Sequence, residues 1–179
     1  MRIDYISDVH LDHYISDTNA SSPKFIKKME ELVRNRIMPA GIGTDFILGE
    51  VLIVAGDISH YNQQSMFFLI ELKKYYDNII LVHGNHDMYL ISSKQASKYQ
   101  YSSDLRINEL KDICERLNVI FLDGDIVNFK NIRIGGTCSW YNLPTSIDIE
   151  NWKKVMNDSE YIYSTKPKTY YYVETSKEY

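Results

Sequence analysis

The chain has 179 residues, a length that predicts one domain covering residues 1–179. Hydrophobic residues make up 44% of the chain and charged residues 25%, which excludes a disordered acidic or basic chain. The net charge of -4 disfavours strong electrostatic binding of nucleic acid, unless metal ions supply the positive charge.

The cysteine content and the first residues bear on the location of the chain. Two cysteines, Cys114 and Cys138, cannot form a disulfide framework, and free thiols suit a reducing cytosol. Charged residues interrupt the first ten positions, so we expect no secretion signal. No stretch approaches the roughly 18 uninterrupted apolar residues of a membrane span. We therefore predict a cytoplasmic protein without membrane contact.

The apolar patterning predicts strands and helices that alternate along the first half of the chain. Such an alternation indicates an α/β fold in which parallel strands are joined by helical crossovers. Later in the chain, three short strands separated by tight turns favour an antiparallel meander. The predicted elements in chain order are a strand at 2–7, a helix at 23–38, a strand at 51–55, a helix at 62–76, a strand at 78–82, a helix at 103–117, strands at 119–122, 125–129 and 131–135, and a helix at 146–157.

Each of the first three predicted strands is followed by side chains that commonly bind metals. The carboxyl ends of parallel strands form one rim of a sheet, and ligands bind there. Side chains far apart in sequence should therefore converge at this rim. The residues are Asp8 and His10 after the first strand, Asp57 after the second, and Asn85, His86 and Asp87 after the third.

These residue types indicate divalent metal ions. Carboxylate and amide oxygens combined with imidazole suit Mn, Fe or Zn better than an ion that prefers thiolates. Clustered carboxylates repel one another, and bound cations remove that repulsion. A pair of such ions would acidify a shared water and hold a phosphate group. The sequence therefore predicts two divalent metal ions and a phosphorylated substrate.

The three motifs together resemble those of a known family. The segments at 8–10 (DVH), 56–57 (GD) and 84–87 (GNHD) are similar to the D-x-H, G-D and G-N-H-[DE] motifs of the calcineurin-like metallophosphoesterases, in the same order. Residues 135–140 (GGTCSW) resemble a G-x-T-x-W stretch of small bacterial and phage members. The resemblance covers residues 1 to about 158. It implies a calcineurin-like α/β/β/α sandwich.

The resemblance also implies a role for each site residue. His86 would protonate the leaving group or stabilise the transition state. Asp87 would orient His86, although capping of the following turn explains this residue equally well. The implied metal ligands are Asp8 and His10 on one ion, Asp57 bridging both ions, and Asn85 on the second ion next to the phosphate.

The sequence departs from the family after its third motif. Family members normally add a histidine after a later strand and then a G-H-x-H pair, whereas this chain has no histidine after His86. The sequence thus resembles a family member shortened at its C-terminus, with an incomplete second metal site. We expect partial metal occupancy, and a second copy or another chain covering the C-terminal side.

Two functions follow from these observations. The first is a metal-dependent phosphoesterase that hydrolyses a phosphomonoester or phosphodiester, with nucleotides and nucleic acids kept among the candidate substrates. The alternative is a shortened, catalytically weak or inactive family member that acts as a protein-binding module. The intact motifs favour the enzyme, and the missing histidines favour the alternative.

The remaining histidines and the cysteines have simpler interpretations. His13 is expected at the surface, and His83 is expected to be a partly buried histidine at a strand end. His60 follows Asp57 by three residues, so it either faces the phosphate or caps a helix. Cys114 falls on an apolar helix face, and Cys138 is expected to pack rather than react.

Overall fold

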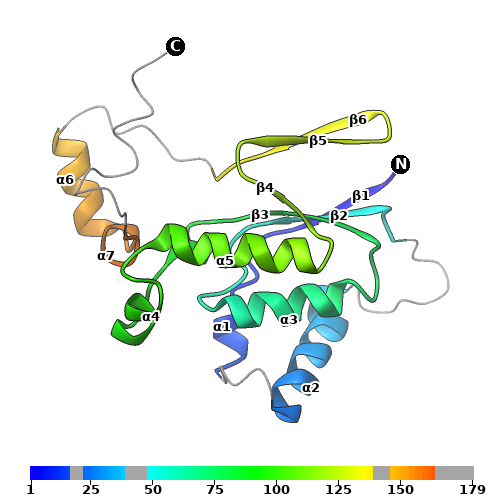
Figure 1. Cartoon of the computed structure of the whole chain (residues 1–179), viewed down its shortest axis with the longest axis horizontal. Helices are drawn as coiled ribbons and strands as arrows, with labels where there is room; N and C mark the ends of the chain where they lie inside the picture. The colour runs from blue at the N-terminus through cyan, green and yellow to red at the C-terminus, as the bar shows by residue number, and fades with distance from the viewer. Residues whose placement is uncertain (17–21, 39–47, 139–145, 164–179) are drawn as a thin grey trace.

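The structure is a computed structural model that describes residues 1–16, 22–38, 48–138 and 146–163. Its centre is a four-stranded sheet in the order β1-β2-β3-β4, with every neighbouring pair parallel (Figure 1). A two-stranded antiparallel sheet follows it in the chain. The strands are β1 (Ile3–Ile6), β2 (Val51–Ala55), β3 (Asn78–Val82), β4 (Ile120–Leu122), β5 (Asp125–Phe129) and β6 (Ile132–Gly136).

The parallel arrangement of the first three predicted strands is confirmed, but the predicted meander is only half right. Strands β5 and β6 form the expected hairpin, with Val127 opposite Ile134. Strand β4 instead runs parallel to β3 and pairs Ile120 with Ile80. The reason is the intervening helix, which supplies the long crossover that a parallel return needs, whereas the two-residue turn after β5 permits an antiparallel return alone.

Helices connect the parallel strands. The predicted helix at 23–38 remains α-helical to Leu32 and ends in a π-helical segment, η1 (Val33–Ile37). Ser22 caps its start by accepting a hydrogen bond from the Phe25 amide at 3.1 Å. Short helices were not predicted, among them the 3₁₀ turn η2 (His86–Met88). The α-helices are α1 (Leu11–Tyr14), α2 (Pro23–Leu32), α3 (Asn62–Leu72), α4 (Ser93–Lys98), α5 (Ser103–Arg116), α6 (Ser146–Val155) and α7 (Asp158–Tyr161).

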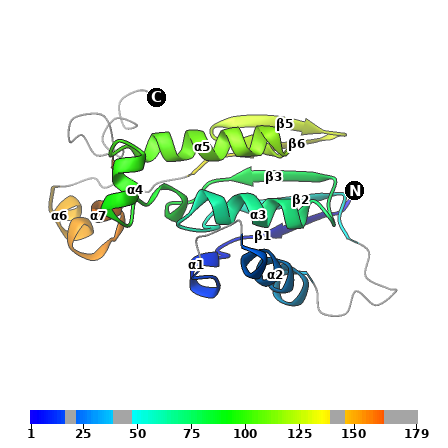
Figure 2. The same cartoon turned by 60° about the horizontal axis from the view of Figure 1, so that its bottom comes forward.

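The two faces of the parallel sheet contact different layers. Because side chains alternate along a strand, Leu52 and Val54 of β2 face helices α2, α3 and α5 in the larger core. Val51 and Ile53 face the β5–β6 hairpin, which lies over the opposite side of the sheet (Figures 1 and 2). This helix–sheet–sheet order agrees with the predicted calcineurin-like fold.

The hairpin covers the β3–β4 side of the sheet and leaves the β1 side open. Gly136 of β6 lies so close to β3 that an added Cβ would stand 2.5 Å from Val82 Cγ2. Tyr5 of β1, on the same face of the sheet, is 80% exposed. Within the described residues, the β1 side of this face is therefore less covered than the β3 side.

The carboxyl ends of β1, β2 and β3 point toward α6 and α7 (Figure 1). Helix α7 and the residues that follow it are held there by backbone hydrogen bonds, from the Leu90 amide to the Tyr161 carbonyl and from the Ser103 amide to the Tyr163 carbonyl, each at 2.8 Å. The predicted helix at 146–157 corresponds to α6. In the ranges that the structure describes, no helix is long and apolar enough to cross a membrane.

Candidate metal centre

The loops after β1 and β2 have an unusual backbone. Asp8, His10 and Asp57 all adopt left-handed φ angles, of 52°, 45° and 52°. Such angles are uncommon outside glycine and cluster at functional sites. The His10 amide donates to the Asp57 carbonyl at 3.0 Å and thereby ties the two loops together.

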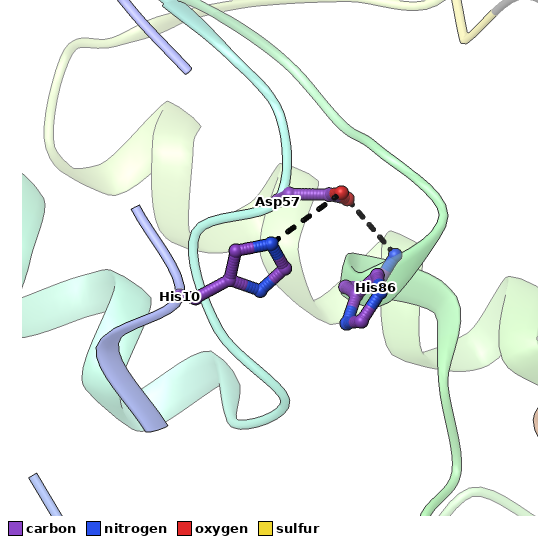
Figure 3. Close-up of side chains that lie close together, drawn as sticks. All are labelled: His10, Asp57 and His86. Carbon is purple, nitrogen blue, oxygen red and sulfur yellow. Dashed lines mark hydrogen bonds and ion pairs between the residues drawn. The ribbon is translucent and has the colours of Figure 1, made fainter. Parts of the chain in front are cut away.

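Three side chains from three different loops meet at this edge of the sheet (Figure 3). His10 Nε2 lies 4.0 Å from Asp57 Oδ2, and the His86 amide donates to Asp57 Oδ1 at 3.0 Å. The rings of His10 and His86 have centroids 4.6 Å apart. One potential ligand atom from each of the three residues lies within 4.8 Å of the others, so together they could hold a metal ion.

The chemistry of this group fits a divalent cation. His10 Nδ1 is buried and has no hydrogen-bond partner within the described part of the chain. Burial raises the pKa of Asp57, and the neighbouring Asp87 charge adds to that rise. A cation beside Asp57 would offset both effects. Imidazole and carboxylate together are typical ligands of Mn, Fe and Zn.

Two of the predicted metal ligands lie outside this group. Asp8 has an exposed side chain and is absent from the set of close ligand atoms. The Asn85 amide nitrogen donates to Asp158 Oδ1 at 2.7 Å and to Tyr89 Oη at 3.2 Å. His86, to which the sequence assigned a catalytic role, lies inside the group instead. The individual metal roles of Asp8 and Asn85 remain predictions.

Asp87 is fully buried and holds two of the loops. Its Oδ2 accepts hydrogen bonds from the amides of Asp57 and Gly84, each at 2.9 Å. Its Oδ1 accepts from the amides of Ile58 at 3.1 Å and Ser59 at 3.5 Å. Among the described residues, all of its hydrogen bonds go to backbone amides. Asp87 therefore fixes the backbone that carries Asp57, and its predicted effect on His86 is untested.

A ring nitrogen of His86 contacts the side chain of His60. His60 Nε2 lies 2.8 Å from His86 Nδ1, and His60 Nδ1 lies 3.2 Å from Asp12 Oδ2. The rings of His60 and His86 stack with centroids 5.0 Å apart. Burial lowers the pKa of His60, although the Asp12 charge opposes that shift. The sequence predicted that His60 either faces the phosphate or caps a helix, and it predicted no role for Asp12.

A buried arginine connects the loops through their backbone carbonyls, and the sequence did not predict it as a site residue. Arg106 of α5 is fully buried and donates to the carbonyls of His86 at 2.9 Å, Tyr89 at 2.6 Å and Ser59 at 2.7 Å. Burial lowers its pKa, and the Asp87 charge opposes that shift. The sequence did carry a signal, because Arg106 lies within the apolar stripe of its helix.

A cleft of about 850 Å³ adjoins the site between the parallel sheet, the hairpin and the segment from α6 to α7. Its described lining combines apolar side chains with carboxylates and contains no lysine or arginine. The lining residues are Ile53, Ala55, Asp57, Val82, His83, Gly84, Asn85, Gly124, Asp125, Ile126, Gly135, Gly136, Thr137, Cys138, Met156 and Asp158.

The burial expected of the other histidines and of Cys114 agrees with the structure, and the absence of a ligand or reactive role for these residues stays a prediction. His13 is exposed, and His83 is buried with its Nε2 at 3.6 Å from Asp123 Oδ1. Cys114 is buried in the core. Burial raises the pKa of the Cys114 and Cys138 thiols to about 12. Of the GGTCSW segment, residues 139–140 lie outside the described ranges.

Parallel strands whose carboxyl ends bring histidine and aspartate side chains together, with a second sheet on one face, are typical of the metallophosphoesterase fold. A sequence profile of the calcineurin-like phosphoesterases matches residues 1–170, and the chain belongs to this family. An uncharacterized protein of Acanthamoeba polyphaga mimivirus is 27% identical over 97 residues, which cover 53% of this chain and 33% of the viral protein.

A solved structure has a similar fold. The crystal structure of a phosphopantetheinyl hydrolase from Mycobacterium tuberculosis matches with a TM-score of 0.57 and 16% identity, over 93% of this chain and 56% of that chain. The chain thus spans 33% and 56% of the lengths of these two proteins. The resemblance and the fold class inferred from the sequence are confirmed. The single domain, the cytoplasmic location and the second chain at the C-terminal side remain predictions.

Proposed function

We propose that this chain is a metal-dependent phosphoesterase that hydrolyses a phosphomonoester or phosphodiester at a centre of two divalent ions, Mn, Fe or Zn. The observation that carries the proposal is the convergence of His10, Asp57 and His86 from three separate loops, with their ligand atoms within 4.8 Å of one another. Family membership supports the reaction class, because the motifs that define the resemblance are the ones that supply these three residues.

Each residue of the group has a distinct task in this proposal. His10 and Asp57 would hold the metal, with Asp57 shared between the two ions and Asp8 and Asn85 completing the ligand set. The ions would supply positive charge for the phosphate and activate a water for attack. His86 faces the same space and carries a proton toward the leaving oxygen. His60 contacts Nδ1 of the His86 ring, and Asp12 in turn holds His60.

The cleft limits the type of substrate. Its described lining offers carboxylates, such as Asp125 and Asp158, and apolar side chains, but no lysine or arginine. A polyanion would be repelled there, so the part of the substrate beyond the phosphate is expected to be neutral or cationic. Because a phosphopantetheinyl hydrolase shares the fold, phosphopantetheinyl compounds are a useful first substrate class to assay.

The proposal is tested by metal content and turnover in matched variants. Asp57→Asn should reduce metal bound per chain and abolish hydrolysis of p-nitrophenyl phosphate and bis-p-nitrophenyl phosphate, because a neutral amide bridges two cations poorly. Asp77→Asn is the control, since it makes the same change at an exposed position before β3, at the opposite end of the sheet. Equal metal content and turnover in both variants would refute the metal role of Asp57.

The non-catalytic alternative makes the opposite prediction. Its support is the absence of histidine after His86 in the sequence, which leaves fewer imidazole ligands for a second ion. A purified chain that binds no Mn²⁺ or Zn²⁺ and hydrolyses neither aryl phosphate would favour a protein-binding module. Bound metal with measurable turnover would favour the enzyme.

A further inference from the structure

A buried carboxylate from helix α7 contacts one of the predicted metal ligands. Asp158 begins α7 and is 3% exposed, and its Oδ1 accepts a hydrogen bond from Asn85 Nδ2 at 2.7 Å. Tyr89, also 3% exposed, donates its hydroxyl proton to the same oxygen at 2.5 Å. Asn85 Nδ2 in turn donates to the Tyr89 hydroxyl at 3.2 Å. The three side chains therefore form a closed triangle.

The donors and acceptors of this triangle determine which way the Asn85 amide points. A carboxylate accepts hydrogen bonds and donates none, whereas an asparagine side chain has two N–H donors and one carbonyl acceptor. Both protons of Asn85 Nδ2 are used, one by Asp158 and one by Tyr89. A flipped amide would place its carbonyl oxygen against the carboxylate and would lose both hydrogen bonds. The nitrogen is therefore held in the triangle, and Oδ1 remains available to the cleft.

We propose that Asp158, together with Tyr89, is a positioning residue that fixes the Asn85 amide so that its carbonyl oxygen can bind a metal ion. The inference rests on the proposed function. It gives helix α7 a part in the site, because α7 is tied to the loop after β3 by the hydrogen bond from the Leu90 amide to the Tyr161 carbonyl. Partners that orient a metal ligand in this way typically change metal affinity about 10–100-fold when they are removed.

The affinity test compares three variants by Mn²⁺ titration calorimetry. Asp158→Ala should raise the dissociation constant for Mn²⁺ by about 10–100-fold. Tyr89→Phe removes one hydrogen-bond acceptor of the Asn85 amide but keeps Asp158, so a smaller increase in the dissociation constant is expected. This variant replaces Asp158→Ala if Asp158→Ala does not fold. Glu160→Gln is the matched control, because it removes a carboxylate from an exposed position of the same helix, and its dissociation constant should equal that of the wild type.

A second measurement needs no metal and no destabilising variant. In the NMR spectrum of the metal-free wild-type chain, the Asn85 side-chain NH₂ pair, assigned by its loss in Asn85→Asp, should exchange slowly with solvent. Rapid exchange, or equal Mn²⁺ affinity in all three variants, would overturn the positioning role. Slow exchange in a chain that binds no Mn²⁺ would overturn the role toward a metal and the proposed function together, and would leave a purely structural contact.

Discussion

The most informative single substitution is Asp87→Asn, because it nearly preserves shape and removes one acceptor. Asp87 Oδ2 accepts from the amides of Asp57 and Gly84, each at 2.9 Å, and Oδ1 accepts from the Ile58 amide at 3.1 Å. An asparagine places an NH₂ group where one of these oxygens stands. Whichever oxygen is replaced, at least one well-formed backbone donor loses its acceptor in a fully buried site.

The size of the effect follows from those contacts. A hydrogen bond to a charged group contributes about 1.5–3 kcal/mol, and the bonds that remain become bonds to a neutral acceptor. We therefore expect a loss of about 3 kcal/mol from the free energy of unfolding, out of about 5–15 kcal/mol for a typical protein. For a chain of this size, that loss corresponds to a fall in Tm of about 6–12 °C.

The assay is urea unfolding followed by circular dichroism, with a thermal scan of the same samples. Asp112→Asn is the control, because Asp112 is exposed on α5, and its unfolding free energy should match that of the wild type. An Asp87→Asn chain as stable as the wild type would refute the loop-fixing role. If that chain also showed a lower kcat, Asp87 would act on His86 as the family resemblance implies.

Three further predictions rest on other parts of the structure. Arg106→Lys should cost about 3–5 kcal/mol in urea unfolding, because one ammonium group cannot replace a guanidinium that joins several carbonyls, and wild-type stability would contradict this. Gly84→Ala should weaken Zn²⁺ binding in calorimetry, since the added Cβ would collide with the Asp57 carboxylate, and unchanged affinity would disprove the clash. Burial raises the pKa values of the Cys114 and Cys138 thiols to about 12, so both should stay neutral at pH 8. Folded protein should therefore react slowly with iodoacetamide, and urea-unfolded protein quickly. Fast labelling of the folded protein would show that these thiols ionise readily.

The sequence predicted the elements whose pattern is local. The apolar run of β2 identifies a strand because both of its faces contact a core, and the same holds for β3. The convergence of His10, Asp57 and His86 was predictable because parallel neighbouring strands bring their carboxyl ends to one rim. These inferences need only the strand positions and the direction of each connection.

The features that the sequence did not predict depend on contacts between distant residues. The pairing of β4 with β3 follows from the crossover through α5, which the spacing of the short strands does not show. The contact between Asp12 and His60 joins residues 48 positions apart, and that between Asn85 and Asp158 spans 73 positions. In the sequence, Asp158 is an ordinary acidic residue at the start of a helix. Its buried position next to a predicted metal ligand becomes evident only in the folded chain.

The central claim is that His10 and Asp57 hold a divalent metal ion in the space that His86 faces, and anomalous diffraction from crystals grown with Zn²⁺ tests it most directly. The account predicts an anomalous peak among the three side chains, with a Zn–N distance of about 2.0–2.1 Å to His10 and a Zn–O distance of about 2.0–2.2 Å to Asp57. A second group of close ligand atoms, formed by His10, Asp12 and His13, is the natural competitor. A peak at that second group alone, or no peak at either position, would contradict the account.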